Sequence, residues 1–115
     1  MTTITDEYMK QMMTTTKPYS IVILRNGPNS QREDRQPIVW EHGRRNFELR
    51  AEGLLSIVCP VLDTGAVRGV RIFSTNIGET KKIMDDDPGV TEGIFVYDFL
   101  PVRIFTGAFL PLKGI

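Results

Sequence analysis

This sequence of 115 residues contains little cysteine, little histidine and no excess of charge of either sign. Cys59 is the single cysteine and His42 the single histidine, which excludes an internal disulfide and metal sites built from several thiolates or imidazoles. Fourteen Lys and Arg balance fourteen Asp and Glu. Because nucleic acids and anionic membranes attract a local excess of basic residues, we expect neither as a partner.

Long apolar runs are also absent. No stretch approaches the roughly 20 apolar residues that a membrane helix needs, and the Thr- and Met-rich segment from Met1 to Lys17 lacks the apolar core of a secretory signal. We therefore expect a cytoplasmic protein that needs no metal or other cofactor. Residues 1–18 are expected to form an arm, partly disordered or with a short helix over Asp6–Met13, and residues 19–115 a single domain.

Turn signals and apolar periodicity divide the domain into alternating elements. Asn26-Gly27-Pro28 ends the first apolar run, Gly53 stands where a helix C-cap is expected, and Asn76 with Glu79 resembles a capping box. The expected strands are 19–24, 54–61, 67–73 and 93–100, with 102–105 as an extension or a fifth strand, and the expected helices are 37–52 and 77–84. This βαββαβ order predicts an α+β, ferredoxin-like fold, with a four-stranded antiparallel sheet and both helices on one face.

The other face of that sheet is also expected to be apolar. Val, Ile, Phe and Leu fill successive positions in the first, second and fourth strands instead of alternating with polar residues. An apolar face of this size needs a cover. We therefore expect a homodimer that forms through the open sheet face.

The segment Asp63-Thr64-Gly65-Ala66 allows two interpretations. It resembles the catalytic loop of retroviral-type aspartic proteases, but those folds are all-β and carry a second motif that is missing here. Asp and Gly are also standard turn formers. The pattern favours a turn between the second and third strands.

His42 and the run Asp85–Asp87 are the candidates for acid–base chemistry. An imidazole is the most common general acid or base near neutral pH, whereas a lone helical His is also often purely structural. Three carboxylates where a helix ends face its negative pole and one another, so we expect at least one carboxyl pKa to be raised. A solvated turn closed by Asp-Pro is the alternative.

Arg71, Tyr97 and Cys59 have weaker signals. Arg71 lies in a predicted strand among apolar residues, where a guanidinium needs a carboxylate or an anionic ligand. Tyr97 either offers its hydroxyl to a cleft or packs. Cys59 is expected to be a small buried hydrophobic residue, since no cation beside it in the sequence would stabilise a thiolate.

Several short motifs together resemble the YCII-related (YciI-like) family. They are His42, Glu52-Gly53-Leu54-Leu55 running to Cys59-Pro60, Gly69-Val70-Arg71-Ile72, and Asp86-Asp87-Pro88-Gly89-Val90-Thr91-Glu92-Gly93. The similarity covers residues 19–107. It implies a dimeric α+β barrel with a His–Asp pair in a cleft, falling on His42 and Asp87, and in related dehydrochlorinases and muconolactone isomerases the chemistry is proton transfer on small substrates.

Two functions remain open on this basis. The first is a small lyase, isomerase or dehydrochlorinase-like enzyme in which Asp87 orients His42 for proton transfer, while Arg71, Tyr97 and Asp86 contact a small organic substrate. The second is a dimeric module that binds a small ligand, or assists a neighbouring enzyme, without turnover. Fold-level similarity does not decide between them.

Overall fold

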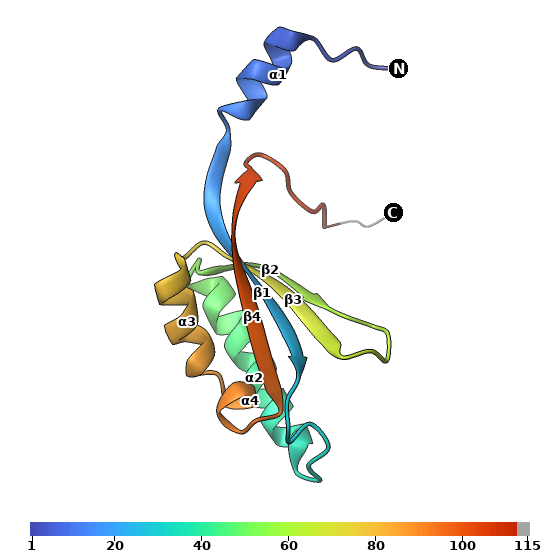
Figure 1. Cartoon of the computed structure of the whole chain (residues 1–115), viewed down its shortest axis with the longest axis vertical. Coiled ribbons are helices and arrows are strands. Elements are labelled where there is room, and N and C mark those ends of the chain that lie inside the picture. The colour runs from blue at the N-terminus through green and yellow to red at the C-terminus, as the bar shows by residue number, and fades with distance from the viewer. Residues whose placement is uncertain (113–115) are drawn as a thin grey trace.

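The chain forms a four-stranded antiparallel sheet with helices on one face, as a computed structural model that describes residues 1–112 shows (Figure 1). The elements follow the predicted order. They are α1 (Asp6–Met13), β1 (Thr16–Asn26), α2 (Arg35–Ala51), β2 (Leu55–Pro60), β3 (Val67–Phe73), α3 (Ile77–Asp85), α4 (Pro88–Thr91) and β4 (Phe95–Phe105). Helix α1 covers the range named for a short helix in the arm, and α4 is a further short helix.

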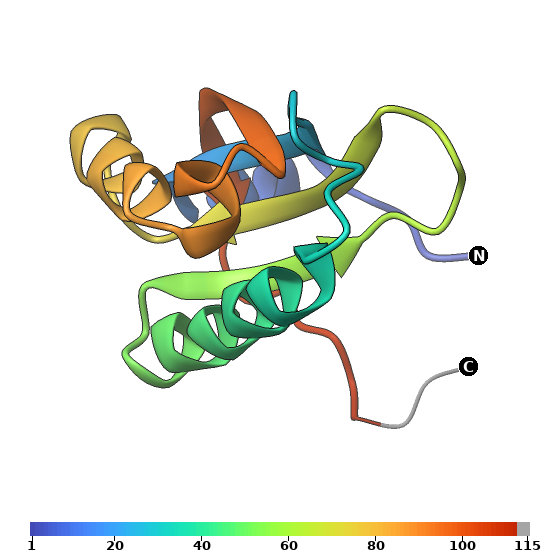
Figure 2. The same cartoon turned by 90° about the horizontal axis from the view of Figure 1, so that it is seen from below.

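The strand order β2-β3-β1-β4 is that of a ferredoxin-like sheet, and every neighbouring pair is antiparallel. This confirms the predicted fold class. The short helix α4 contacts both α2 and α3 (Figures 1 and 2). Segments distant in the sequence therefore meet between α2, α4 and the sheet.

The ends of the main helices follow local signals. The side chain of Asn76 accepts a hydrogen bond from the Glu79 N–H, which caps α3 as predicted. Gly53 follows α2 with a φ of 79°, a left-handed conformation that favours glycine. Helix α2 begins at Arg35, two residues before the position expected from Pro37.

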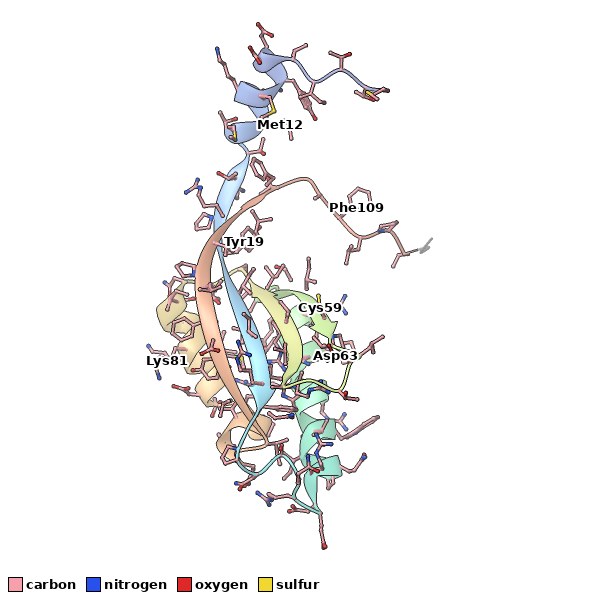
Figure 3. The ribbon with its side chains drawn as sticks, turned by 45° about the vertical axis from the view of Figure 1, so that its right-hand side comes forward. Met12, Tyr19, Cys59, Asp63, Lys81 and Phe109 are labelled. Atoms are coloured by element: carbon pink, nitrogen blue, oxygen red, sulfur yellow. The ribbon has the colours of Figure 1, made fainter. Side chains whose placement is uncertain are left out.

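Strands β1 and β4 are longer than expected and pair along their whole length, from Thr16 opposite Phe105 to Asn26 opposite Phe95. Pro101 interrupts no pairing because β4 is an edge strand, where a missing N–H is tolerated. The two strands extend past the rest of the sheet as a ribbon, with α1 at the far end (Figure 1). The C-terminal segment that carries Phe109 also lies apart from the sheet (Figure 3).

The two faces of the sheet differ in what covers them. One face packs against the helices, with a buried core of eight apolar residues: Val22, Leu24, Leu49, Leu55, Phe73, Met84, Ile94 and Phe95. The alternate residues point to the open face. They are mainly apolar, as expected: Ile21, Ile23, Ile57, Val70, Ile72, Val96 and Leu100, with one ion pair between Arg25 and Asp98.

Residues 61–66 connect β2 to β3 as a turn (Figure 3). The Gly65 N–H donates to Asp63 Oδ1 at 2.9 Å, and Arg68 Nη2 donates to the carbonyl oxygens of Asp63 and Gly65. The Asp63 carboxylate therefore stabilises its own turn. The segment is therefore the turn between the second and third strands, as the sequence pattern favours.

Gly27 stands where the chain leaving β1 crosses the start of β4, and its N–H donates to the Ile94 carbonyl at 2.8 Å. A Cβ at this position would lie 2.3 Å from the backbone oxygen of Gly93. We expect Gly27→Ala to lower the free energy of unfolding by about 1–3 kcal/mol, since backbone must shift to make room. Urea denaturation followed by circular dichroism measures this loss.

Gly78→Ala is the matched control, because a Cβ there meets only Asn76 Oδ1, at 3.5 Å, and Gly78 lies within α3. Alanine is the better helix former by roughly 0.5–1 kcal/mol. The two substitutions should therefore change stability in opposite directions. A Gly27→Ala protein as stable as wild type would show that the β1–β4 crossing is not tightly packed.

Candidate active site

Asp87 is placed by the short connection between α3 and β4. It is completely buried and is the N-cap of α4, where its Oδ2 accepts hydrogen bonds from the N–H groups of Gly89, at 3.0 Å, and Val90, at 3.3 Å. The sequence pattern predicts a helix end or a solvated turn here and does not predict α4. The Asp-Pro dipeptide was the available signal for α4, since Asp favours the N-cap and Pro the first helical position.

His42 reaches Asp87 from α2 across 45 residues of sequence. Its Nδ1 lies 2.8 Å from Asp87 Oδ2, and the imidazole is 7% exposed. The ring also packs against Phe95 on β4, with centroids 4.8 Å apart. The structure therefore brings together the two residues of the predicted His–Asp pair and fixes the orientation of the ring.

Arg71 joins this pair from β3. Its Nη2 lies 2.6 Å from His42 Nε2, and its side chain is buried at 2% exposure. A guanidinium has only donors and an ionised carboxylate only acceptors. Nδ1–H of His42 therefore donates to Asp87, and Arg71 is the donor in its contact with the ring, where Nη2 also lies 3.2 Å from Nδ1.

The buried charges shift one another's pKa values. Burial alone would raise the pKa of the Asp87 carboxyl, but the hydrogen bond from His42 and the charge of Arg71 outweigh it, so the pKa falls below 3.8. Burial lowers the pKa of Arg71 to about 10, although Asp87 opposes that change. At neutral pH the site therefore holds an ionised carboxylate and a guanidinium, both beside the imidazole.

The three consecutive carboxylates point in different directions, which corrects the expectation that their repulsion raises a pKa. Asp85 accepts from Lys81 and from the Tyr97 hydroxyl, each at 2.5 Å, and its pKa is lowered by these hydrogen bonds. The Asp86 side chain is 86% exposed and lies 3.7 Å from Arg45. The pKa values of Asp85 and Asp87 thus both move downwards.

Two predicted substrate contacts lie outside this cluster. Tyr97 lies two residues beyond Phe95 on the helix-covered face of β4, and its hydroxyl donates to Asp85 on α3 and not to His42. Asp86 faces solvent. Of the three residues expected to contact substrate, Arg71 alone is brought to the His–Asp pair.

A cavity of about 250 Å³ opens beside His42, between α2 and the β2–β3 hairpin. Its walls combine apolar side chains such as Val58 and Phe95 with the polar groups of Asn46, Arg68 and Arg71. Cys59 also lines it and is exposed, contrary to the expectation of burial, because β2 is an edge strand with no neighbour beyond it. The cavity is suited to a ligand smaller than a typical drug molecule.

The arrangement of the elements is similar to that of a solved enzyme. This is 5-chloro-2-hydroxyhydroquinone dehydrochlorinase (TftG) from Burkholderia phenoliruptrix AC1100, in complex with 2,5-dihydroxybenzoquinone. The two structures superpose with a TM-score of 0.57 at 16% sequence identity, over 71% of this chain and 90% of that one. At this identity the likeness shows a shared fold.

Comparison at the level of sequence gives no further assignment. No family model matches the chain, and no curated protein matches it. Across residues 1–112, no group of three or more His, Cys, Asp and Glu side chains is arranged to hold a metal ion. Nor is any helix in this range long and apolar enough to span a membrane.

The geometry determines what the site can do chemically. Asp87 holds the Nδ1–H of His42, so Nε2 is the atom that can accept a proton and later return it. Arg71 Nη2 lies 2.6 Å from that atom in the structure. A substrate that exchanges a proton with Nε2 must therefore approach it beside this guanidinium or displace it.

Proposed function

We propose that this protein is a small acid–base enzyme of the YCII-related type, in which His42 moves a proton on a small organic substrate bound in the adjacent cavity. The observation that carries the proposal is the buried 2.8 Å hydrogen bond from His42 Nδ1 to Asp87, beside a cavity that His42 lines. A carboxylate behind an imidazole fixes its tautomer and stabilises the imidazolium formed during proton transfer.

The reaction class supported by this arrangement is a lyase, isomerase or dehydrochlorinase-like proton transfer. The fold shared with a dehydrochlorinase agrees with that class without assigning it, because one fold hosts many activities. Asp87 is the orienting residue in this proposal and His42 the proton carrier. Arg71 contacts the substrate.

The test is turnover on a panel of small substrates in D₂O. The panel contains phenols, lactones, organic acids and their halogenated forms, including 5-chloro-2-hydroxyhydroquinone, the compound named for the structural relative. Proton NMR detects deuterium entering a C–H position and anion analysis detects released halide. Catalysis above the buffer rate supports the proposal, whereas saturable binding without exchange or elimination on any member contradicts it.

A binding module without turnover is the second candidate, and one observation favours it. Arg71 Nη2 lies 2.6 Å from Nε2 and 3.2 Å from Nδ1, so a buried cation contacts the nitrogen that a base would use. In this alternative the same cavity binds its ligand while the buried cluster only supports the wall. Saturable binding with no turnover on the panel would be its signature.

We further propose a homodimer that forms through the open sheet face, with residues 1–18 as an arm on the domain of residues 19–115. Leu100 and Val96 on that face are 52% and 44% exposed, and apolar surface of this extent is stabilised by burial against a partner. Light scattering should give about twice the chain mass of 13.0 kDa at micromolar concentration. A mass of one chain would contradict the dimer.

Ile72→Lys tests which face is used. Ile72 lies on the open face of the central strand β3, paired with Ile21 and Ile57. A buried lysine in the interface should dissociate the dimer, while Lys81→Ala on the exposed side of α3 should leave the mass unchanged. If the Ile72→Lys protein remains a dimer, the interface lies elsewhere on the protein.

A further inference from the structure

The Arg71 guanidinium is buried without a carboxylate in contact. Its side chain is 2% exposed, and its hydrogen-bonding partners are the ring nitrogens of His42 and, at 3.4 Å, the Met84 sulfur. Within residues 1–112 no carboxylate oxygen lies within 4.0 Å of it. Since a guanidinium bonds most strongly to a carboxylate, through two parallel N–H···O bonds, its present partners are weak ones.

A second arginine brings an unused donor to the same cavity. Arg68 Nη2 donates to carbonyl oxygens of the β2–β3 turn and lies 3.4 Å from Asp63 Oδ1, while its buried Nε has no acceptor in the part of the chain that the structure describes. No Asp or Glu of residues 1–112 lines this cavity. A wall with two guanidinium groups and no carboxylate favours an anion.

The rest of the wall specifies the uncharged part of such a ligand. Leu24, Val39, Val58 and Phe95 line the cavity, and Phe95 also packs against the His42 ring. These side chains favour an apolar or aromatic body. With about 250 Å³ of space, the ligand has the size of a single substituted ring or a short aliphatic chain.

We propose that the cavity binds a small organic carboxylate with an apolar or aromatic body, and that the carboxylate draws the Arg71 guanidinium away from His42 Nε2. Binding of the substrate and release of the base are then one event. This inference rests on the proposed function for the role of the freed Nε2. It adds the substrate class and makes Arg71 the residue that keeps His42 inactive in the empty site.

A cavity that recognises a carboxylate binds a charged ligand more tightly than an uncharged ligand of the same shape. Benzoate and benzamide test this difference in the wild-type protein. The two molecules have nearly the same shape, and benzoate alone carries a negative charge. We expect benzoate to bind at least tenfold more tightly in an NMR titration. Equal affinity for the two would overturn the proposal.

The single histidine allows its own hydrogen bonds to be observed directly. All imidazole nitrogen signals in a long-range ¹H–¹⁵N spectrum belong to His42. On saturation with benzoate, the Nε2 signal should shift as it loses the Arg71 donor, while Nδ1 keeps its proton and its bond to Asp87. An Nε2 signal that stays unchanged at saturation would show that Arg71 does not move.

Arg71→Gln and Arg50→Gln form a matched pair of variants. Each removes one positive charge, but Arg50 lies in the last turn of α2 and does not line the cavity. We expect Arg71→Gln to lose the preference for benzoate over benzamide and Arg50→Gln to retain it. Retention by Arg71→Gln would overturn the proposal, and the wild-type titrations decide the question if that variant fails to fold.

These measurements need no turnover, so they separate the two proposals. Suppose that benzoate is preferred and Arg71 leaves Nε2, but no member of the substrate panel reacts. The protein would then be a carboxylate-binding module, and the proposed enzymatic function would be overturned. Turnover on uncharged substrates, with no preference for benzoate, would support the proposed enzyme and overturn the proposal that its ligand is a carboxylate.

Discussion

Replacing His42 by glutamine is expected to reduce turnover by about 10²–10⁴-fold, the usual contribution of a positioned general acid or base. Glutamine is polar and of similar reach, so its amide can still donate a hydrogen bond to Asp87. An amide nitrogen has no basic lone pair, and it cannot take a proton from the substrate. Rates of deuterium exchange or halide release on the best substrate of the panel measure the loss.

Tyr97→Phe is the control for this variant. The tyrosine hydroxyl is expected from the sequence to contact substrate, but it donates to Asp85, the last residue of α3. We expect its removal to leave turnover unchanged. A loss of activity equal to that of His42→Gln would move the site from the His42 cavity towards α3.

Replacing Asp87 by alanine is expected to lower the free energy of unfolding by about 3–5 kcal/mol, the range found when one partner of a buried pair of charges is removed. The variant loses the hydrogen bond to His42 and two bonds to the backbone of α4. It also leaves the buried Arg71 cation without the negative charge nearby. Chemical denaturation of both proteins at neutral pH measures the difference.

Asp86→Ala is a control one residue away. Its side chain is 86% exposed, and a change at such a position normally alters stability by no more than about 0.5 kcal/mol. If Asp86→Ala and Asp87→Ala destabilise the protein equally, the buried position of Asp87 is not what stabilises the fold.

The effect of Asp87 should also depend on pH. Its pKa is lowered in the folded protein, so its contribution to stability is complete above the unfolded value of 3.8 and is lost as the pH falls towards the folded value. The alanine variant has no carboxyl to protonate at this position. The gap in stability between wild type and Asp87→Ala should therefore narrow below about pH 3.8, and a gap that widens in acid would contradict the assigned direction.

Much of the fold follows from local sequence, because its signals act over a few residues. The Asn76 cap, Gly53 after α2 and the turn at Asp63 are found where the pattern predicts them. The full length of β1 and β4 was missed, since their outer parts are stabilised by each other across about 90 residues of sequence. Local propensity carries no information about such a partner.

The site was less predictable for the same physical reason. The pairing of His42 with Asp87 came from resemblance to a family, because nothing local links residues 45 apart. The contact of Arg71 with His42 had no signal beyond a charged residue in an apolar strand. The directions of Asp85, Asp86 and Asp87 depend on where a four-residue helix begins, which repulsion between neighbouring charges does not reveal.

One oxygen of Asp87 accepts three hydrogen bonds, from a side chain on α2 and from two backbone groups of α4. Any mutation that removes this carboxylate must therefore disturb both the local fold and the orientation of the imidazole. Neither property can be changed at this position without the other. Apart from Arg71, the residues of β2 and β3 that line the cavity form no side-chain hydrogen bond with Asp87 or His42. During evolution, substitutions that change ligand specificity should accumulate at these other positions of the β2–β3 hairpin, while Asp87 and His42 are retained.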